Sequence, residues 1–94
     1  MKVEIVKSVC KEAEKLPKPY RNMVDEQIEI LENAKTLYDV SNIFKIQGTN
    51  EPYYRLKFGA YRLMMYYNEK TNCLKILSLT HRKDTYKKQN LPWR

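Results

Sequence analysis

The stretch YYRLKFGAYRLMMYY (residues 53–67) constrains the fold more than any other part of this sequence. Apolar and basic side chains alternate on both sides of Gly59-Ala60, and a period of two residues is typical of a β-strand. Gly59-Ala60 has the Gly-X composition that suits a type II′ turn. The stretch therefore predicts two antiparallel strands that are joined by a two-residue loop.

A hairpin with this loop fixes which side chains share a face of the sheet. Lys57 pairs with Arg62, and Leu56 pairs with Leu63. One face then carries an apolar set that suits a core, namely Leu56, Phe58, Tyr61 and Leu63. The other face carries three cations with no acidic residue in the hairpin to neutralise them, namely Arg55, Lys57 and Arg62.

Like charges that lie directly opposite each other destabilise a sheet, so the three cations need an explanation. They could simply point into water, where surface charges cost little. Alternatively, they could bind an anion such as a phosphodiester, because arginine offers phosphate a planar fork of donors and lysine offers a point charge. Such a site could stabilise the charge that builds up on a phosphate during RNA cleavage.

Before the hairpin, the sequence predicts a strand and two helices. Residues 1–6 alternate as a first strand. Ser8 is placed to cap a helix that runs to Leu16, and Pro19 suits the first turn of a second helix, whose apolar stripe ends at Leu31. A short loop between two helices predicts that they are antiparallel.

The remaining segments complete an α+β fold. Residues 35–50 show one short helical turn and a turn signal at Gly48. Residues 68–72 form a turn before a third apolar strand at 74–79. The predicted architecture is a single domain over residues 1–94, with an N-terminal strand, an antiparallel helix pair on one sheet face, and a three-stranded antiparallel meander.

The net charge of +7 is concentrated in one half of the chain. Residues 1–52 carry eight Lys or Arg and nine Asp or Glu, whereas residues 53–94 carry ten and two, together with six of the eight tyrosines. A basic, aromatic surface is the usual footprint of nucleic-acid binding. A solvated basic face, or one that docks an acidic protein, would have the same composition.

Several function classes find no support in the sequence. Cys10 and Cys73 lie far apart without CxxC spacing, so we expect two buried thiols and neither a zinc site nor a disulfide framework. No phosphate-binding glycine loop, metal-ligand motif or GxSxG elbow occurs, so we expect no metal and no other cofactor. No apolar run approaches the ~20 residues of a membrane span, and the N-terminus has no apolar signal-peptide segment. We therefore expect a cytoplasmic protein without a membrane partner.

The stretch THRKDTY (residues 80–86) contains further candidate site residues. His81 is the only histidine, so a pair of histidines cannot act as acid and base, but His81 could still carry a proton. Arg82 and Lys83 add positive charge, and Tyr86 could stack on an exposed base. The ordinary alternatives are a hydrogen-bonded structural histidine, a Lys83 that pairs with Asp84 in water, and a tyrosine packed on the sheet.

In this order and spacing, YYRLKFGAYRLMMYY and LTHRKDTY resemble the RelE/ParE superfamily of bacterial toxins. The resemblance implies the element order β-α-α-β-β-β. It also implies a ribosome-dependent endoribonuclease, which cuts messenger RNA in the A site by attack of a ribose 2′-OH on the adjacent phosphate, without a metal. The implied partners are a cognate antitoxin and mRNA on the ribosome, with contacts to 16S ribosomal RNA.

Position by position, the resemblance implies catalytic roles for five residues. Arg55 and Lys57 match the basic pair that generates or orients the nucleophile, and Arg62 matches the arginine that stabilises the phosphate. Arg82 matches the general acid toward the leaving 5′ oxygen. Tyr86 matches the tyrosine that stacks on a base.

Other roles stay open. Arg55 stands where the best-known members have lysine, and an arginine side chain keeps its proton, so the base is Lys57 or His81. His81 and Lys83 are also candidates for substrate binding.

The superfamily also contains members that do not cut RNA. ParE-type toxins inhibit DNA gyrase without nuclease activity, and degenerate members retain only binding. The combination of Arg62, Arg82 and Tyr86 favours the RNA-cutting branch.

Overall fold

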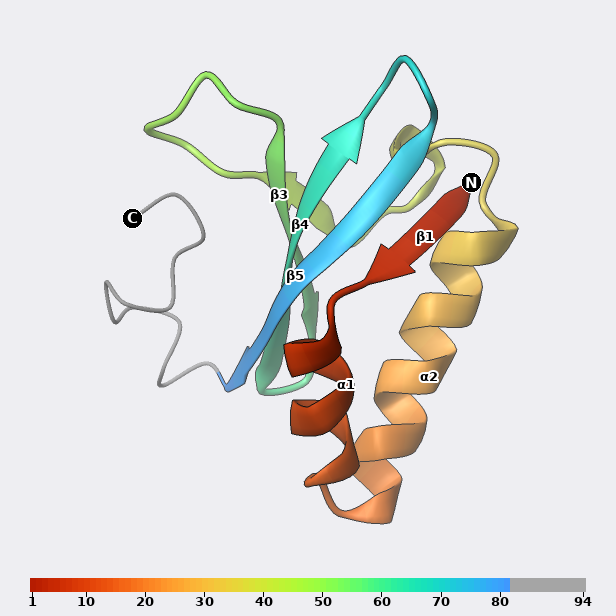
Figure 1. The fold of residues 1–94 in the computed structure, drawn as a ribbon, viewed down its shortest axis with the longest axis vertical. Coiled ribbons are helices and arrows are strands. Elements are labelled where there is room, and N and C mark those ends of the chain that lie inside the picture. The colour runs from red at the N-terminus through yellow and green to blue at the C-terminus, as the bar shows by residue number, and fades with distance from the viewer. Residues whose placement is uncertain (82–94) are drawn as a thin grey trace.

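A five-stranded sheet with two helices on one face forms the framework of residues 1–81, which are the residues that the computed structural model describes (Figure 1). Along the chain the elements are β1 (Lys2–Ile5), α1 (Lys7–Glu14), α2 (Lys18–Asn33), the 3₁₀ turn η1 (Leu37–Asp39), β2 (Ile43–Lys45), β3 (Tyr53–Phe58), β4 (Tyr61–Asn68) and β5 (Cys73–His81). The strands lie in the order β1-β5-β4-β3-β2. β1 runs parallel to β5, and the other neighbours are antiparallel. The predicted α+β fold class is confirmed.

The sheet contains one more antiparallel strand than the sequence predicts. Residues 43–45 form β2, a three-residue edge strand that pairs with β3. The predicted helical turn is present at Leu37–Asp39, where the backbone N–H of Thr36 donates to Asp39 Oδ2 at 3.1 Å. Three residues carry no recognisable period, so only the pairing with β3 makes this segment a strand.

The predicted hairpin and its register are confirmed. β3 ends at Phe58 and β4 begins at Tyr61, and Lys57 lies opposite Arg62. Gly59 has a positive φ of 57°, as the first loop position of a type II′ turn requires. A Cβ atom at this position would lie 3.2 Å from Met23 Cε. Both the backbone and the contact with α2 therefore favour glycine.

The first helix begins one residue earlier than its predicted cap. The backbone N–H of Val6 donates to Ile76 O at 3.2 Å, which holds the chain against β5 up to Val6. α1 then begins at Lys7, so Ser8 lies inside its first turn and the prediction that Ser8 caps the helix is wrong. α2 carries Pro19 in its first turn, as predicted. No helix within residues 1–81 is long and apolar enough to cross a membrane.

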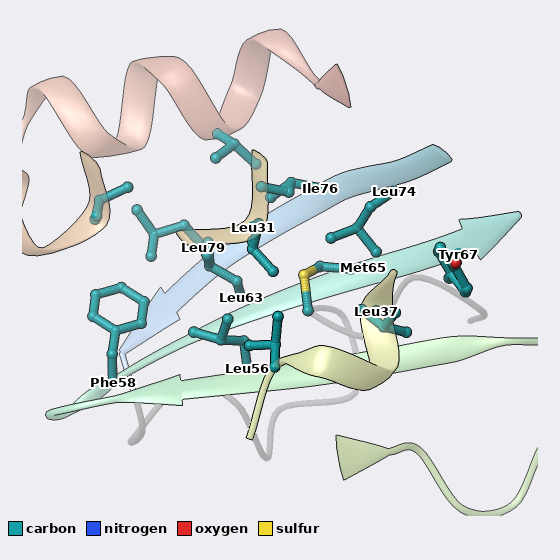
Figure 2. Close-up of a cluster of buried hydrophobic side chains, with 13 residues drawn as sticks. Leu31, Leu37, Leu56, Phe58, Leu63, Met65, Tyr67, Leu74, Ile76 and Leu79 are labelled. Atoms are coloured by element: carbon teal, nitrogen blue, oxygen red, sulfur yellow. The ribbon is translucent and has the colours of Figure 1, made fainter. Parts of the chain in front are cut away.

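The core lies between the helices and the sheet (Figure 2). Leu31 of α2 and Leu37 of η1 lie over the strands, where Leu56, Leu63 and Met65 point toward them (Figure 2). All five side chains are at most 1% exposed. Burying a side chain of this size contributes about 1.5–3 kcal/mol to the stability of the fold. This layer therefore holds the helix pair against the sheet, and the opposite face of the sheet is not needed for that packing.

The two cysteines differ in their surroundings. Cys73 is half-buried on β5, but Cys10 is exposed on α1, so the prediction of two buried thiols is wrong for Cys10. Val9 is the buried residue of α1. A step of one residue turns the side chain by about 100° around the helix axis, which carries Cys10 away from the core.

Candidate functional site

The sheet face opposite the helices carries two rows of side chains that run across the strands. Residues directly opposite each other in neighbouring strands point to the same face. The first row consists of Phe44, Arg55, Met64 and Ser78 on β2 to β5. The second row consists of Lys57, Arg62 and Thr80 on β3 to β5. We call this surface the open face.

Three cations from the predicted site meet on the open face. Lys57 is exposed, and Arg55 and Arg62 are half-buried. The ion pairs within residues 1–81 join Lys2 to Glu4 and Lys15 to Glu12, so none of them involves the three cations. Within the described part of the chain, the charge of this group is therefore not neutralised by a carboxylate. We call Arg55, Lys57 and Arg62 the cation cluster.

Two contacts reduce the repulsion between Lys57 and Arg62. Lys57 Nζ lies 5.2 Å from the centre of the Phe44 ring, a cation–π contact that draws the ammonium group toward β2. Arg62 Nη1 donates to Tyr61 O at 3.1 Å on β4. Because β2 and β4 lie on opposite sides of β3, the two charges are held apart although their Cα atoms are paired.

The row beside this pair contains polar atoms without partners. Arg55 Nε and Ser78 Oγ are both buried and have no hydrogen-bond partner among the described residues. They lie on either side of Met64 in the first row. Buried polar atoms are normally satisfied, so this row is unusual, but a ligand on the open face would reach these two atoms only after the side chains around them had moved. Ser78 is not among the site residues predicted from the sequence, although its position two residues before Thr80 places both on one face.

His81 lies on the opposite face from the cation cluster. It pairs with Tyr61 across β4 and β5, and its ring meets the Tyr61 ring edge-on, with centroids 5.4 Å apart and an interplanar angle of 85°. Tyr61 packs against the helix-covered core. The structure therefore does not bring His81 together with Lys57, its rival for the role of base. Arg82, Lys83 and Tyr86, the other predicted site residues, lie outside the described residues.

At the other end of the hairpin, tyrosines line a hollow of about 290 Å³. Tyr38 Oη donates to Glu69 Oε1 at 3.3 Å, and Tyr66 Oη donates to Glu51 Oε2 at 3.4 Å. Desolvation is the largest cause that raises the pKa of both tyrosines, followed by Tyr54 and Glu69 for Tyr38 and by Glu51 for Tyr66. The lining residues are Tyr38, Pro52, Tyr54, Tyr66, Tyr67, Asn68, Glu69 and Lys70. Tyr38 and Tyr66 therefore remain neutral donors, and the hollow is separate from the cation cluster.

The open face also limits what chemistry its residues can supply. Within residues 1–81, no group of three or more His, Cys, Asp or Glu is placed to hold a metal ion. The groups that the cation cluster offers are guanidinium and ammonium donors, which suit the non-bridging oxygens of a phosphate. The arrangement can bind a phosphodiester and stabilise negative charge on it.

Solved structures with the same fold identify the family. A chain in the crystal structure of the archaeal RelE–RelB complex from Pyrococcus horikoshii OT3 is 33% identical, with a TM-score of 0.71, and the match covers 86% of this chain and 93% of that chain. This chain belongs to the RelE toxin superfamily. Its order of strands and helices is the β-α-α-β-β-β order that the sequence resemblance to RelE implied, with the short strand β2 added before the hairpin.

Further RelE structures share the fold. The RelB–RelE antitoxin–toxin complex from Methanococcus jannaschii matches at 26% identity and a TM-score of 0.72, over 88% of this RelE-superfamily chain and 94% of that chain. The isolated Escherichia coli RelE toxin matches at 19% identity and a TM-score of 0.62, over 85% and 82% of the two chains, which is a likeness of fold. No family model and no curated protein sequence matches this chain.

Proposed function

We propose that this RelE-superfamily chain is the toxin of a type II toxin–antitoxin system and acts as a ribosome-dependent endoribonuclease on mRNA in the A site. The observation that carries the proposal is the cation cluster. Arg55, Lys57 and Arg62 share one sheet face, and no carboxylate of the described residues pairs with them. A phosphodiester is the anion that such a group of fixed donors fits best.

The proposed reaction is attack of a ribose 2′-OH on the adjacent phosphate. The 2′ oxygen gives its proton to the amine of Lys57 and bonds to phosphorus, and the bond from phosphorus to the 5′ oxygen breaks. Lys57 helps to generate or orient the nucleophile, while Arg55 and Arg62 stabilise the charge that builds up on the phosphate. Arg82 returns a proton to the leaving 5′ oxygen, and Tyr86 stacks on a base.

The proposed partner is a cognate antitoxin. Two of the similar structures are RelE–RelB complexes, in which the toxin fold is bound to an antitoxin. The half of the chain from residue 53 onward is strongly basic, so an acidic segment of an antitoxin could cover the open face and neutralise it. Such a segment can remain disordered until it binds.

We expect dependence on the ribosome because the described residues of the open face include few groups that can carry a proton. His81 lies on the helix-covered face, which leaves Lys57 as the titratable group of the cation cluster. Orientation of the reacting groups can supply about 7–11 kcal/mol of a barrier. A ribosome that fixes the 2′-OH in line with the phosphate would supply this contribution, and we therefore expect naked RNA to be cut slowly.

Primer extension on a defined message bound to 70S ribosomes with an open A site tests the proposal. We expect cleavage at the A-site codon by the wild-type protein only when ribosomes are present, and none by Arg62→Ala or Arg82→Ala. Arg21→Ala is the matched control, because Arg21 is an exposed arginine on α2. Circular dichroism checks that each variant is folded.

Two results would contradict the proposal. Cleavage at the wild-type rate by Arg62→Ala would remove the cation cluster from the reaction. A folded wild-type protein that leaves the message intact would exclude the nuclease activity, and inhibition of gyrase supercoiling would then be measured.

A further inference from the structure

Phe44 is an exposed aromatic residue on the open face. It lies in the edge strand β2 opposite Arg55, and 49% of its surface is exposed. It is absent from the buried cluster that joins the helices to the sheet. Its ring therefore does not stabilise the core and presents an apolar plane to solvent beside three cations.

The ring is already held by one member of the cation cluster. Lys57 Nζ lies 5.2 Å from its centre. Both residues project from neighbouring strands, whose spacing is about 4.8 Å, and Arg62 lies one strand further away. A phosphate bound between Lys57 and Arg62 would thus lie within about 10 Å of an exposed aromatic surface, a span that neighbouring parts of one nucleotide chain can bridge.

We propose that Phe44 is a stacking platform for one nucleobase of the RNA whose phosphate the cation cluster holds. This inference rests on the proposed function. It adds a contact to a nucleobase, whereas the cation cluster contacts the phosphate backbone of the RNA. Single-stranded nucleic acids are typically bound by a combination of cationic groups for the phosphates and aromatic rings for the bases. An unpaired base buries its plane on the ring, and its phosphate neutralises the adjacent cations.

An RNA base fits this surface better than an apolar side chain of a protein partner. The cation cluster borders the ring, and no ion pair within residues 1–81 neutralises it. A ligand that covers Phe44 without supplying negative charge would leave desolvated cations unpaired at its rim. A nucleotide supplies both the planar apolar group and the anion.

The test uses 70S ribosomes programmed with a message that carries 2′-O-methyl riboses, which cannot be cut, and 2-aminopurine at one position in or beside the A-site codon. Fluorescence of 2-aminopurine falls when the base stacks. We expect the wild type and Phe44→Tyr to quench one position of the message. Phe44→Leu, which keeps an apolar side chain, should abolish that quenching and weaken binding by roughly 5- to 100-fold, as expected for the loss of one stacked base.

Tyr38→Leu is the matched control, because Tyr38 is 64% exposed at the other end of the hairpin and should leave quenching at that position unchanged. Quenching that is equal in the wild type and Phe44→Leu, or missing from both, overturns the inference. Loss of affinity for the antitoxin in Phe44→Leu with unchanged quenching would assign the ring to a protein contact and also overturn it.

The outcome is separate from that of the proposed function. Quenching that depends on Phe44, in a protein that fails to cut an unmodified message, would support the stacking contact and refute the nuclease. Cleavage of the unmodified message, without quenching that depends on Phe44, would support the nuclease and refute the stacking contact.

Discussion

The ring of Tyr61 meets the ring of His81 edge-on, with centroids 5.4 Å apart, on the helix-covered side of the sheet. Arg62, the next residue after Tyr61, points to the open face because side chains alternate along a strand. His81, the chain's only histidine, therefore lies on the face of Tyr61, whereas the proposed phosphate site lies on the face of Arg62. This relationship removes the most familiar proton carrier from the cation cluster.

We therefore expect His81→Asn to leave cleavage on the ribosome within about three-fold of wild type, with the same pH dependence between pH 5 and 8. Lys57→Ala should lower single-turnover cleavage by about 100-fold or more, since acid–base groups contribute about that much. The measurement is the rate of primer-extension product formation at several pH values. A loss of activity in His81→Asn that equals the loss in Lys57→Ala would show that His81 acts in the reaction.

The core can be tested with two neighbouring residues of α2. Leu31 is fully buried and Ile30 is 49% exposed. Leu31→Ala should lower the free energy of unfolding by about 2–5 kcal/mol, because it removes packed atoms and leaves a cavity. Ile30→Ala should change it by no more than about 1 kcal/mol. Urea unfolding followed by circular dichroism measures both, and equal losses would place the core elsewhere.

The hairpin loop can be tested with two glycines. Gly59 and Gly48 both have positive φ, but a Cβ atom would contact Met23 only at Gly59, with nothing within 4 Å at Gly48. Gly48→Ala should cost about 1 kcal/mol for backbone strain, and Gly59→Ala should cost about 1 kcal/mol more. Thermal unfolding of the two variants provides the comparison. A smaller loss at Gly59 would mean that Met23 moves aside without difficulty.

Stability at alkaline pH should depend on Tyr38 and Tyr66. Desolvation is the largest cause of the raised pKa of each tyrosine in the folded state, followed by Tyr54 and Glu69 for Tyr38 and by Glu51 for Tyr66. A raised folded pKa favours the neutral phenol, so this contribution to stability is complete below the ordinary tyrosine pKa of 10.0 and is lost as the pH rises through the folded pKa. The double variant Tyr38→Phe/Tyr66→Phe should therefore lose less stability between pH 9 and 11 than the wild type in urea unfolding. An identical loss would show that these two groups do not contribute.

The hairpin could be predicted from the sequence because several local signals agree. The alternation of residues 53–67 specifies the faces, and Gly59-Ala60 specifies the loop length, which together leave one register. The same alternation predicts that the cation cluster lies on one face of the sheet. The family resemblance rested on this stretch as well.

Features that depend on contacts between distant segments could not be predicted in the same way. β2 is a strand only because Ile43–Lys45 pairs with β3, so the place of Phe44 beside Lys57 was not foreseen. The face on which His81 lies does have a signal in the sequence. His81 follows Leu79 by two residues, and Leu79 belongs to the core.

The order of the strands has a consequence for the synthesis of this protein. Lys2 of β1 pairs with Cys73 of β5. The first strand to leave the ribosome therefore has no partner until the last strand of the sheet has been synthesised. Contacts between such distant residues form late, because a long loop must close first. A nascent chain that stops before β5 therefore lacks the strand that joins β1 to β4. The fold that carries the open face can form only after most of the chain has been translated, which delays any toxicity until that point.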